Sequence, residues 1–212
     1  MTRRRAKFAL IAVAVVAIAI AAAVVWVRSD ERTSGAQGPF LTAEDFPAGY
    51  KVTRLPNTAP SGIGGTTTPT ECGAIVAEQA GRQLRSATVG VLATKDGAPT
   101  FAQSVITGGE SVSDTDAVVR RCSSYRQQTD TESLESISSI VSTPAGCPGD
   151  VVVVRATTRL SAAAEQSDST SVSAYVQGSN AVGVLTVSLD RPEEPIPDEF
   201  CRLASVVADG LE

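Results

Sequence analysis

The sequence predicts an α+β protein in which a mostly antiparallel sheet packs with about three helices, two disulfides staple the domain, and one N-terminal transmembrane helix precedes it. Three observations predict this class. Apolar and polar residues alternate along several segments of the second half of the chain, which is typical of strands. Other segments carry apolar residues at helical spacing. Four cysteines follow a single long apolar run near the N-terminus.

The apolar run is a candidate membrane anchor. Residues 8–27 form 20 consecutive positions without a charge, and a helix of that length spans about 30 Å, the thickness of a bilayer's hydrocarbon core. Basic residues at positions 3, 4, 5 and 7 precede the run, so the positive-inside rule predicts that residues 1–7 are a cytoplasmic tail and that the rest lies outside. The competing interpretation is a cleaved signal peptide, whose apolar region is usually shorter, about 7–15 residues. We favour a cell-membrane protein with a single uncleaved span.

The remainder divides into a spacer and one domain. Residues 28–40 are polar and contain glycine, which predicts a flexible spacer. Residues 41–212 suit one extracytoplasmic domain with a sizeable core. Without the five basic residues that flank the apolar run, 13 basic and 23 acidic residues remain, a formal charge of about −10. Such a domain repels phosphates, so we expect no nucleic-acid partner.

Local patterns place the elements of this domain. Strands are predicted at residues 50–55, 86–94, 99–107, 136–142, 151–160, 171–177 and 181–189, with Asp96-Gly97 as a hairpin turn. Helices are predicted from Thr68, from about residue 113 and from about residue 198. In the first helix Thr68 is the expected cap, with Pro69 at the first helical position and Glu71 completing a capping box. Alternation in the segments 151–160 and 171–177 predicts a sheet with one solvent-exposed face.

The four cysteines, Cys72, Cys122, Cys147 and Cys201, all lie on the predicted outer side. An even number in an oxidising compartment predicts two disulfides. A zinc site is not expected, because the closest pair is 25 residues apart and the chain has no histidine. Three pairings are possible, and we favour Cys72–Cys122 with Cys147–Cys201. Cys72 and Cys122 fall on apolar faces of the first two predicted helices, and Tyr125 is expected beside Cys122 on the second.

Short motifs add a resemblance. The segment 41–50 (LTAEDFPAGY), the helix start Thr68-Pro-Thr-Glu-Cys72 and the helix Val118-Val-Arg-Arg-Cys122 together resemble the extracellular sensor domain of the mycobacterial PknH-type kinases and of related actinobacterial envelope proteins. The resemblance covers most of residues 41–212. It implies the fold, an extracytoplasmic location and sequential pairing of the cysteines. Members of that family often carry a tryptophan just before the second cysteine, where this chain has Arg120 and Arg121.

Catalytic chemistry is not predicted. Without histidine there can be no histidine-based triad, and no serine lies in a G-x-S-x-G turn. The acidic pairs Glu193-Glu194 and Asp198-Glu199 resemble paired carboxylates, but they precede a predicted helix, where acids suit the helix dipole. The sequence therefore predicts a protein that is not an enzyme, with no catalytic residue, cofactor or metal.

Five arginines are the candidate ligand-binding residues, since together they could hold an anion: Arg120, Arg121, Arg126, Arg155 and Arg159. The leading hypothesis is a membrane-anchored, non-catalytic extracytoplasmic domain that binds an unidentified ligand, either a small molecule or an envelope protein. One alternative is a structural accessory subunit of an envelope complex. The other is a cell-envelope hydrolase that uses serine or carboxylates.

Overall fold

The structure, a computed structural model, describes residues 40–55, 65–86, 90–107, 111–162 and 165–212, without the side chains of 79–86 and 165. The predicted cytoplasmic tail, the predicted transmembrane segment and nearly all of the predicted spacer lie outside these residues. In the part of the chain that is described, no helix is both long enough and apolar enough to span a membrane.

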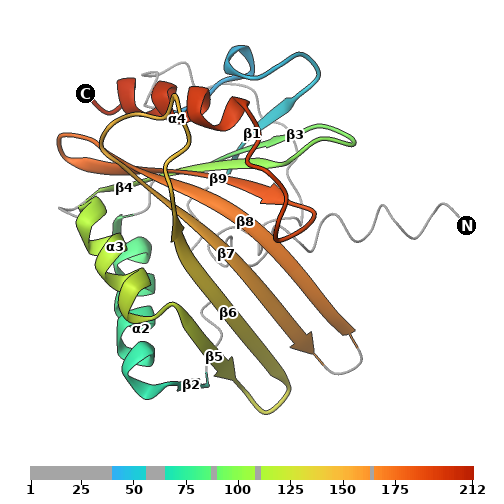
Figure 1. Cartoon of the computed structure of the whole chain (residues 1–212), viewed down its shortest axis with the longest axis vertical. Coiled ribbons are helices and arrows are strands. Elements are labelled where there is room, and N and C mark those ends of the chain that lie inside the picture. Colours follow the sequence, from blue (N-terminus) through green and yellow to red (C-terminus); the bar gives the residue numbers. More distant parts are fainter. Residues whose placement is uncertain (1–39, 56–64, 87–89, 108–110, 163–164) are drawn as a thin grey trace, which may run out of the picture.

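A single nine-stranded antiparallel sheet organises the described residues and confirms the α+β class (Figure 1). Its strands lie in the order β1-β3-β4-β9-β8-β7-β6-β5-β2. Their bounds are β1 Lys51–Leu55, β2 Thr66–Thr68, β3 Gly90–Thr94, β4 Phe101–Thr107, β5 Ser124–Gln128, β6 Glu132–Val141, β7 Val151–Ala162, β8 Glu165–Gln177 and β9 Ala181–Leu189. The predicted Asp96-Gly97 turn joins β3 to β4, and Gly97 has a φ of 71°, a left-handed conformation that favours glycine.

Three α-helices in the described residues cover the two faces of the sheet: α2 Thr70–Ser86, α3 Val112–Arg121 and α4 Glu199–Asp209. A short 3₁₀ turn, η3 Ala43–Asp45, precedes β1. The helix α4 lies on one face and buries Phe200, Leu203, Ala204 and Val207, which share one side of the helix. The helices α2 and α3 lie against the other face. Ser111 and Asp114 form a capping box at the start of α3.

The main core lies between α4 and the sheet. The buried residues of α4 pack there with side chains from the central strands, among them Phe101, Val153, Val172 and Leu185. A smaller cluster on the opposite face joins Val112 of α3 to Ile106, Val182 and Val184. Both faces are therefore buried near the middle of the sheet.

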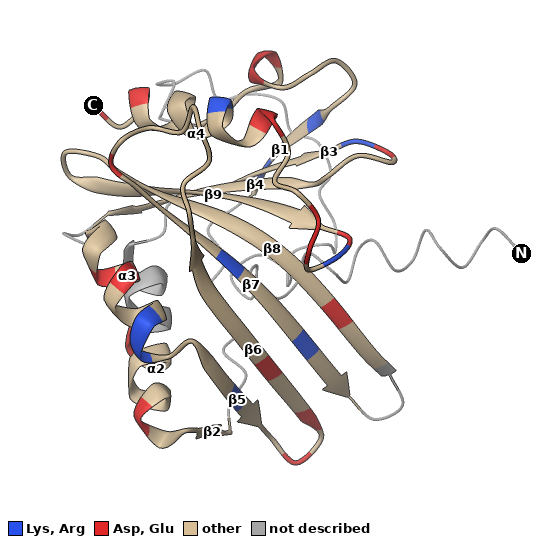
Figure 2. Cartoon of the chain, viewed as in Figure 1, with Lys and Arg blue, Asp and Glu red and all other residues tan. Residues whose placement is uncertain are grey.

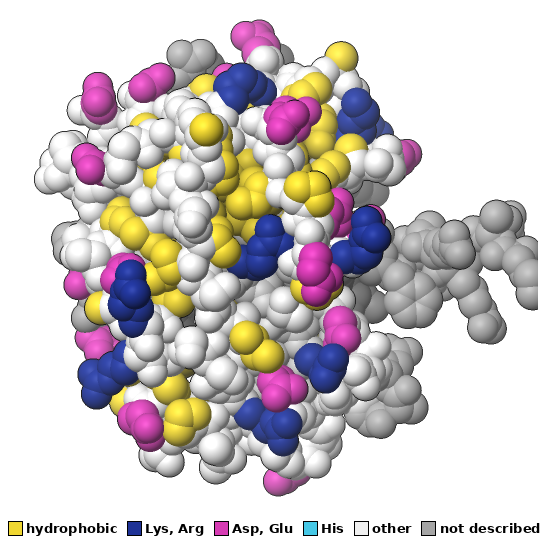
Figure 3. All heavy atoms as spheres, in the orientation of Figure 1, with side chains coloured by type: hydrophobic (Ala, Val, Ile, Leu, Met, Phe, Trp, Pro, Cys, Tyr) yellow, Lys and Arg dark blue, Asp and Glu magenta, His cyan; other side chains and the backbone are white. Residues whose placement is uncertain are grey.

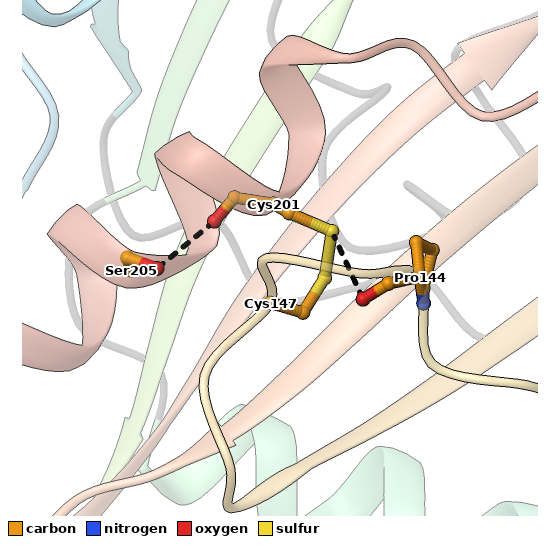
Figure 4. The surroundings of a disulfide bond; sticks show 4 residues. All are labelled: Pro144, Cys147, Cys201 and Ser205. Atoms are coloured by element: carbon orange, nitrogen blue, oxygen red, sulfur yellow. Dashed lines mark hydrogen bonds between the residues drawn. A yellow bond between two sulfur atoms is a disulfide. The ribbon is translucent and has the colours of Figure 1, made fainter.

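Two disulfides have the predicted pairing. Cys72–Cys122 joins the first turn of α2 to the end of α3. Cys147–Cys201 joins the β6–β7 connection to α4, with the Cys201 sulfur 3.9 Å from the carbonyl oxygen of Pro144 (Figure 4). The second disulfide therefore links the long β6–β7 connection to α4, the helix that covers the main core.

Two details of the predicted helices are wrong. Thr68 is the last residue of β2 rather than a helix cap, and α2 begins at Thr70, where the Cys72 amide donates to the Pro69 carbonyl oxygen at 3.1 Å. Because α2 continues to Ser86, the next strand begins at Gly90 instead of residue 86. Tyr125 is not part of the second predicted helix, because α3 ends at Arg121. It lies on β5, a strand that the sequence did not predict.

The prediction of one solvent-exposed sheet face is also wrong for the middle of the sheet. Ser171 and Ser173 of β8, expected to face water, are 6% and 4% exposed. They lie on the face that α2 and α3 cover, where the Ser173 and Thr186 hydroxyls hydrogen-bond at 2.9 Å. Small polar residues alternate in the sequence whether they face water or a layer of helices, so alternation alone could not distinguish these two cases.

Candidate functional site

The strands β5 to β8 extend beyond the part of the sheet that α4 covers (Figure 1). On the α4 side of this extension lie Arg126, Glu135, Ile137, Thr157, Arg159 and Asp168, which we call the open face. Their shared side follows from strand register, because directly opposed residues of neighbouring antiparallel strands point the same way. Thr157 and Arg159 lie on the same side of β7 as Val153 and Arg155, because every second residue of a strand points the same way. Val153 belongs to the core beneath α4.

Four charged residues cross the open face in a single row. Arg126 of β5 is opposite Glu135 of β6, Glu135 is opposite Arg159 of β7, and Arg159 is opposite Asp168 of β8. Their signs alternate, positive, negative, positive, negative (Figure 2). Arg126 Nη2 lies 3.4 Å from a carboxylate oxygen of Glu135, and Arg159 donates to both carboxylate oxygens of Asp168 at 3.0 and 3.2 Å. We call this row the charge ladder.

Each charged side chain in the ladder has a partner and is also exposed to solvent. The side chains of Arg159 and Asp168 are 52% and 51% exposed. The Arg159 guanidinium holds the pKa of Asp168 below its ordinary value, mainly through the hydrogen bond, and that hydrogen bond raises the pKa of Arg159. Exposed pairs of this kind contribute little to stability, because water screens the attraction between the two charges. The ladder has no net charge and adds little to the fold.

An apolar side chain stands in the next row. Ile137 lies two residues along β6 from Glu135 and is 55% exposed. Among the described side chains, it is the large hydrophobic one that is exposed. It is opposite Ser124 on β5 and Thr157 on β7. Seen from this side, hydrophobic side chains gather in the upper half, while the lower half carries mostly polar and charged atoms (Figure 3). Ile137 is therefore an isolated apolar contact point in a polar, ion-paired surface.

The structure separates the five arginines that the sequence proposed as ligand-binding residues. Arg120 and Arg121 end α3, on the opposite face of the sheet, and Arg120 pairs with Asp116 at 2.7 Å. Arg155 donates to the carbonyl oxygens of Pro192 and Glu194 and so holds the connection that leads into α4.

Only Arg126 and Arg159 share a site, and each has a carboxylate partner. Sequence reasoning missed Glu135, Asp168 and Ile137. Alternation marks which side of a strand they occupy, but the row appears only once the strand register is known.

A concave feature lies away from the open face, at the end of α4. It has a volume of about 240 Å³ and is lined by Phe40, Val105, Thr107, Ser179, Asn180, Ala181, Gly210 and Leu211. This is smaller than the pockets of about 300–1,000 Å³ that usually hold drug-sized ligands. The described residues contain no group of three or more cysteines or carboxylates placed to hold a metal ion.

Two solved structures are similar to this chain. One is the Rv0999 ortholog from Mycobacterium smegmatis, an uncharacterised protein, with 13% identity and a TM-score of 0.45 over 79% of this chain and 92% of the other. The second is the extracellular domain of PknH from Mycobacterium tuberculosis, with 13% identity and a TM-score of 0.45 over 82% of this chain and 92% of that domain. PknH is also the kinase type whose extracellular domain the sequence motifs resemble. Neither a protein-family model nor a curated protein sequence matches the chain.

Proposed function

We propose that this protein is a membrane-anchored, non-catalytic extracytoplasmic domain whose open face binds another protein chain. The observation that carries the proposal is the exposed Ile137 beside a row of paired, exposed charges. Interfaces commonly combine a small apolar centre with a polar, hydrogen-bonding rim. A surface of this composition remains soluble when free and still offers specific contacts to a partner.

A protein partner fits the open face better than a small anion does. Arg126 and Arg159 already have carboxylate partners, so a free anion would have to displace Glu135 or Asp168. A row of side chains on adjacent strands is also a flat surface, whereas small-molecule sites are concave and bury most of the ligand. A partner that presents its own alternating charges can bind the ladder without breaking its ion pairs.

The extracytoplasmic location rests on two features of the chain. Disulfides such as Cys72–Cys122 and Cys147–Cys201 form and persist in oxidising compartments. The apolar run at residues 8–27 is long enough to anchor the domain, and its basic flank favours a cytoplasmic N-terminus.

Site-specific photo-crosslinking in the native cell tests the proposal. A photoreactive amino acid replaces Ile137 in the full-length chain, and in a matched control it replaces Thr53, an exposed residue of β1 at the far edge of the sheet. We expect a discrete protein adduct from position 137 and none of the same mass from position 53. Absence of an adduct at 137, or the same adducts from both positions, would overturn the proposal.

A further inference from the structure

We propose that the partner of the open face is a second copy of this chain, related by a twofold axis that runs parallel to the strands between β6 and β7. This inference rests on the proposed function, because it names the protein that the open face binds. Its basis is the order of charges in the ladder, which is complementary to itself when reversed.

The charge argument follows from the strand register. Rotation about an axis parallel to the strands keeps the ladder at the same position along the strands. It reverses the order of the four residues across the strands. The row Arg126, Glu135, Arg159, Asp168 then meets the row Asp168, Arg159, Glu135, Arg126 of the second copy. Every guanidinium is opposite a carboxylate, four times over. Rotation about an axis along the row would instead place like charges together, so the ladder selects one of the two face-to-face arrangements.

Ile137 and Thr157 fit the same axis. They are directly opposed on β6 and β7, one row from the ladder toward α4, and so stand on either side of the proposed axis. Rotation places Ile137 of each copy over Thr157 of the other. Neighbouring strands are about 4.8 Å apart, so the two Ile137 side chains lie next to each other across the axis. The large hydrophobic side chain that the described residues leave exposed is thereby covered beside the axis, on the α4 side of the ladder.

The contact is small. Four strands spaced about 4.8 Å apart and three rows spaced about 6.8 Å apart give roughly 400 Å² per copy, or roughly 800 Å² in total. Stable complexes usually bury about 1,200–2,000 Å², so the free protein should dimerise weakly. A shared membrane raises the effective concentration of anchored copies, which allows weak contacts to form.

The helix α4 rises from the same face and limits the contact to the far ends of the strands. Arg155, which holds the connection into α4, is four residues from Arg159 along β7, a distance of about 13 Å. The two sheets therefore diverge beyond the Ile137 row, toward α4.

Energy transfer between differently labelled full-length copies in lipid vesicles tests the arrangement. The key variant inverts the whole ladder, R126E/E135R/R159E/D168R. It keeps the pairing within one chain and between two inverted chains, but it places like charges opposite each other when an inverted chain meets an unaltered one. An R120E variant, changed on α3, is the control and should behave as the unaltered chain.

We expect energy transfer above the random level between unaltered copies and between inverted copies, and only the random level in the mixture of the two. Free mixing of unaltered and inverted chains, or random transfer throughout, would overturn the second copy as the partner. If position 137 crosslinks to a different protein while unaltered copies show random transfer, the proposed function stands and this inference fails. If neither experiment gives a contact, both fail.

Discussion

Replacing Gly183 by alanine tests how closely α4 packs on the sheet. This packing determines which part of the sheet remains uncovered. A Cβ at position 183 would lie 2.5 Å from Cγ1 of Val207 and 2.9 Å from Cδ1 of Leu211. Both side chains are buried, so α4 has to shift. Overpacking of this kind costs about 1–3 kcal/mol, while alanine recovers about 0.5–1 kcal/mol over glycine in a strand. We expect the free energy of unfolding to fall by about 1–2 kcal/mol.

Denaturant unfolding followed by circular dichroism measures the effect in the purified full-length protein. The matched control is Gly149→Ala, because a Cβ there has no neighbour within 4 Å. The double variant Gly183→Ala with Val207→Ala removes the closest contact, so it should be more stable than the sum of its two single changes implies. A Gly183→Ala protein as stable as the control would refute this packing of α4, and so would strictly additive changes in the free energy of unfolding.

Three further predictions concern the Cys147–Cys201 disulfide, the connection into α4 and the charge ladder. Serine in place of both Cys147 and Cys201 should lower the free energy of unfolding by about 2–5 kcal/mol, which denaturant unfolding measures; an unchanged midpoint would contradict this. R155M removes two donors to backbone carbonyl oxygens and should destabilise by about 1–3 kcal/mol in the same assay, against which a neutral result would count. The pKa of Asp168 is lowered by Arg159, so its small stabilising effect is present above the unfolded value of about 3.8 and disappears as the pH falls through the folded value. R159Q should raise the pKa of Asp168 in an NMR titration, and an unchanged value would dismiss the pairing.

The elements that the sequence predicted correctly have strong local signals. The strands β7, β8 and β9 alternate over long segments, and the Asp96-Gly97 turn sets the β3–β4 hairpin. The apolar positions of α4 repeat at helical spacing. The cysteine pairing was also predicted, since Cys72 and Cys122 were expected on the apolar faces of two helices; in the structure Cys122 is the residue that directly follows α3.

The elements that were missed have weak local signals. The strand β2 has three residues and β5 is the polar segment SYRQQ, so both depend on pairing with their neighbours rather than on their own apolar content. The charge ladder could not be predicted for a related reason. It joins Arg126 to Asp168 through three strand pairings, and a shift of one residue in any of them would move a charge to the other face.

The accessibility of position 137 shows whether the open face is covered by a partner in the membrane. Ile137→Cys in the full-length chain is labelled with a membrane-impermeant maleimide, first in the native membrane and then after purification into dilute detergent, with Thr53→Cys as the reference. We expect labelling at 137 to be several-fold slower in the membrane than in detergent, and labelling at 53 to be the same in both. Equal rates at 137 in the two settings would contradict the claim that the open face is a binding surface.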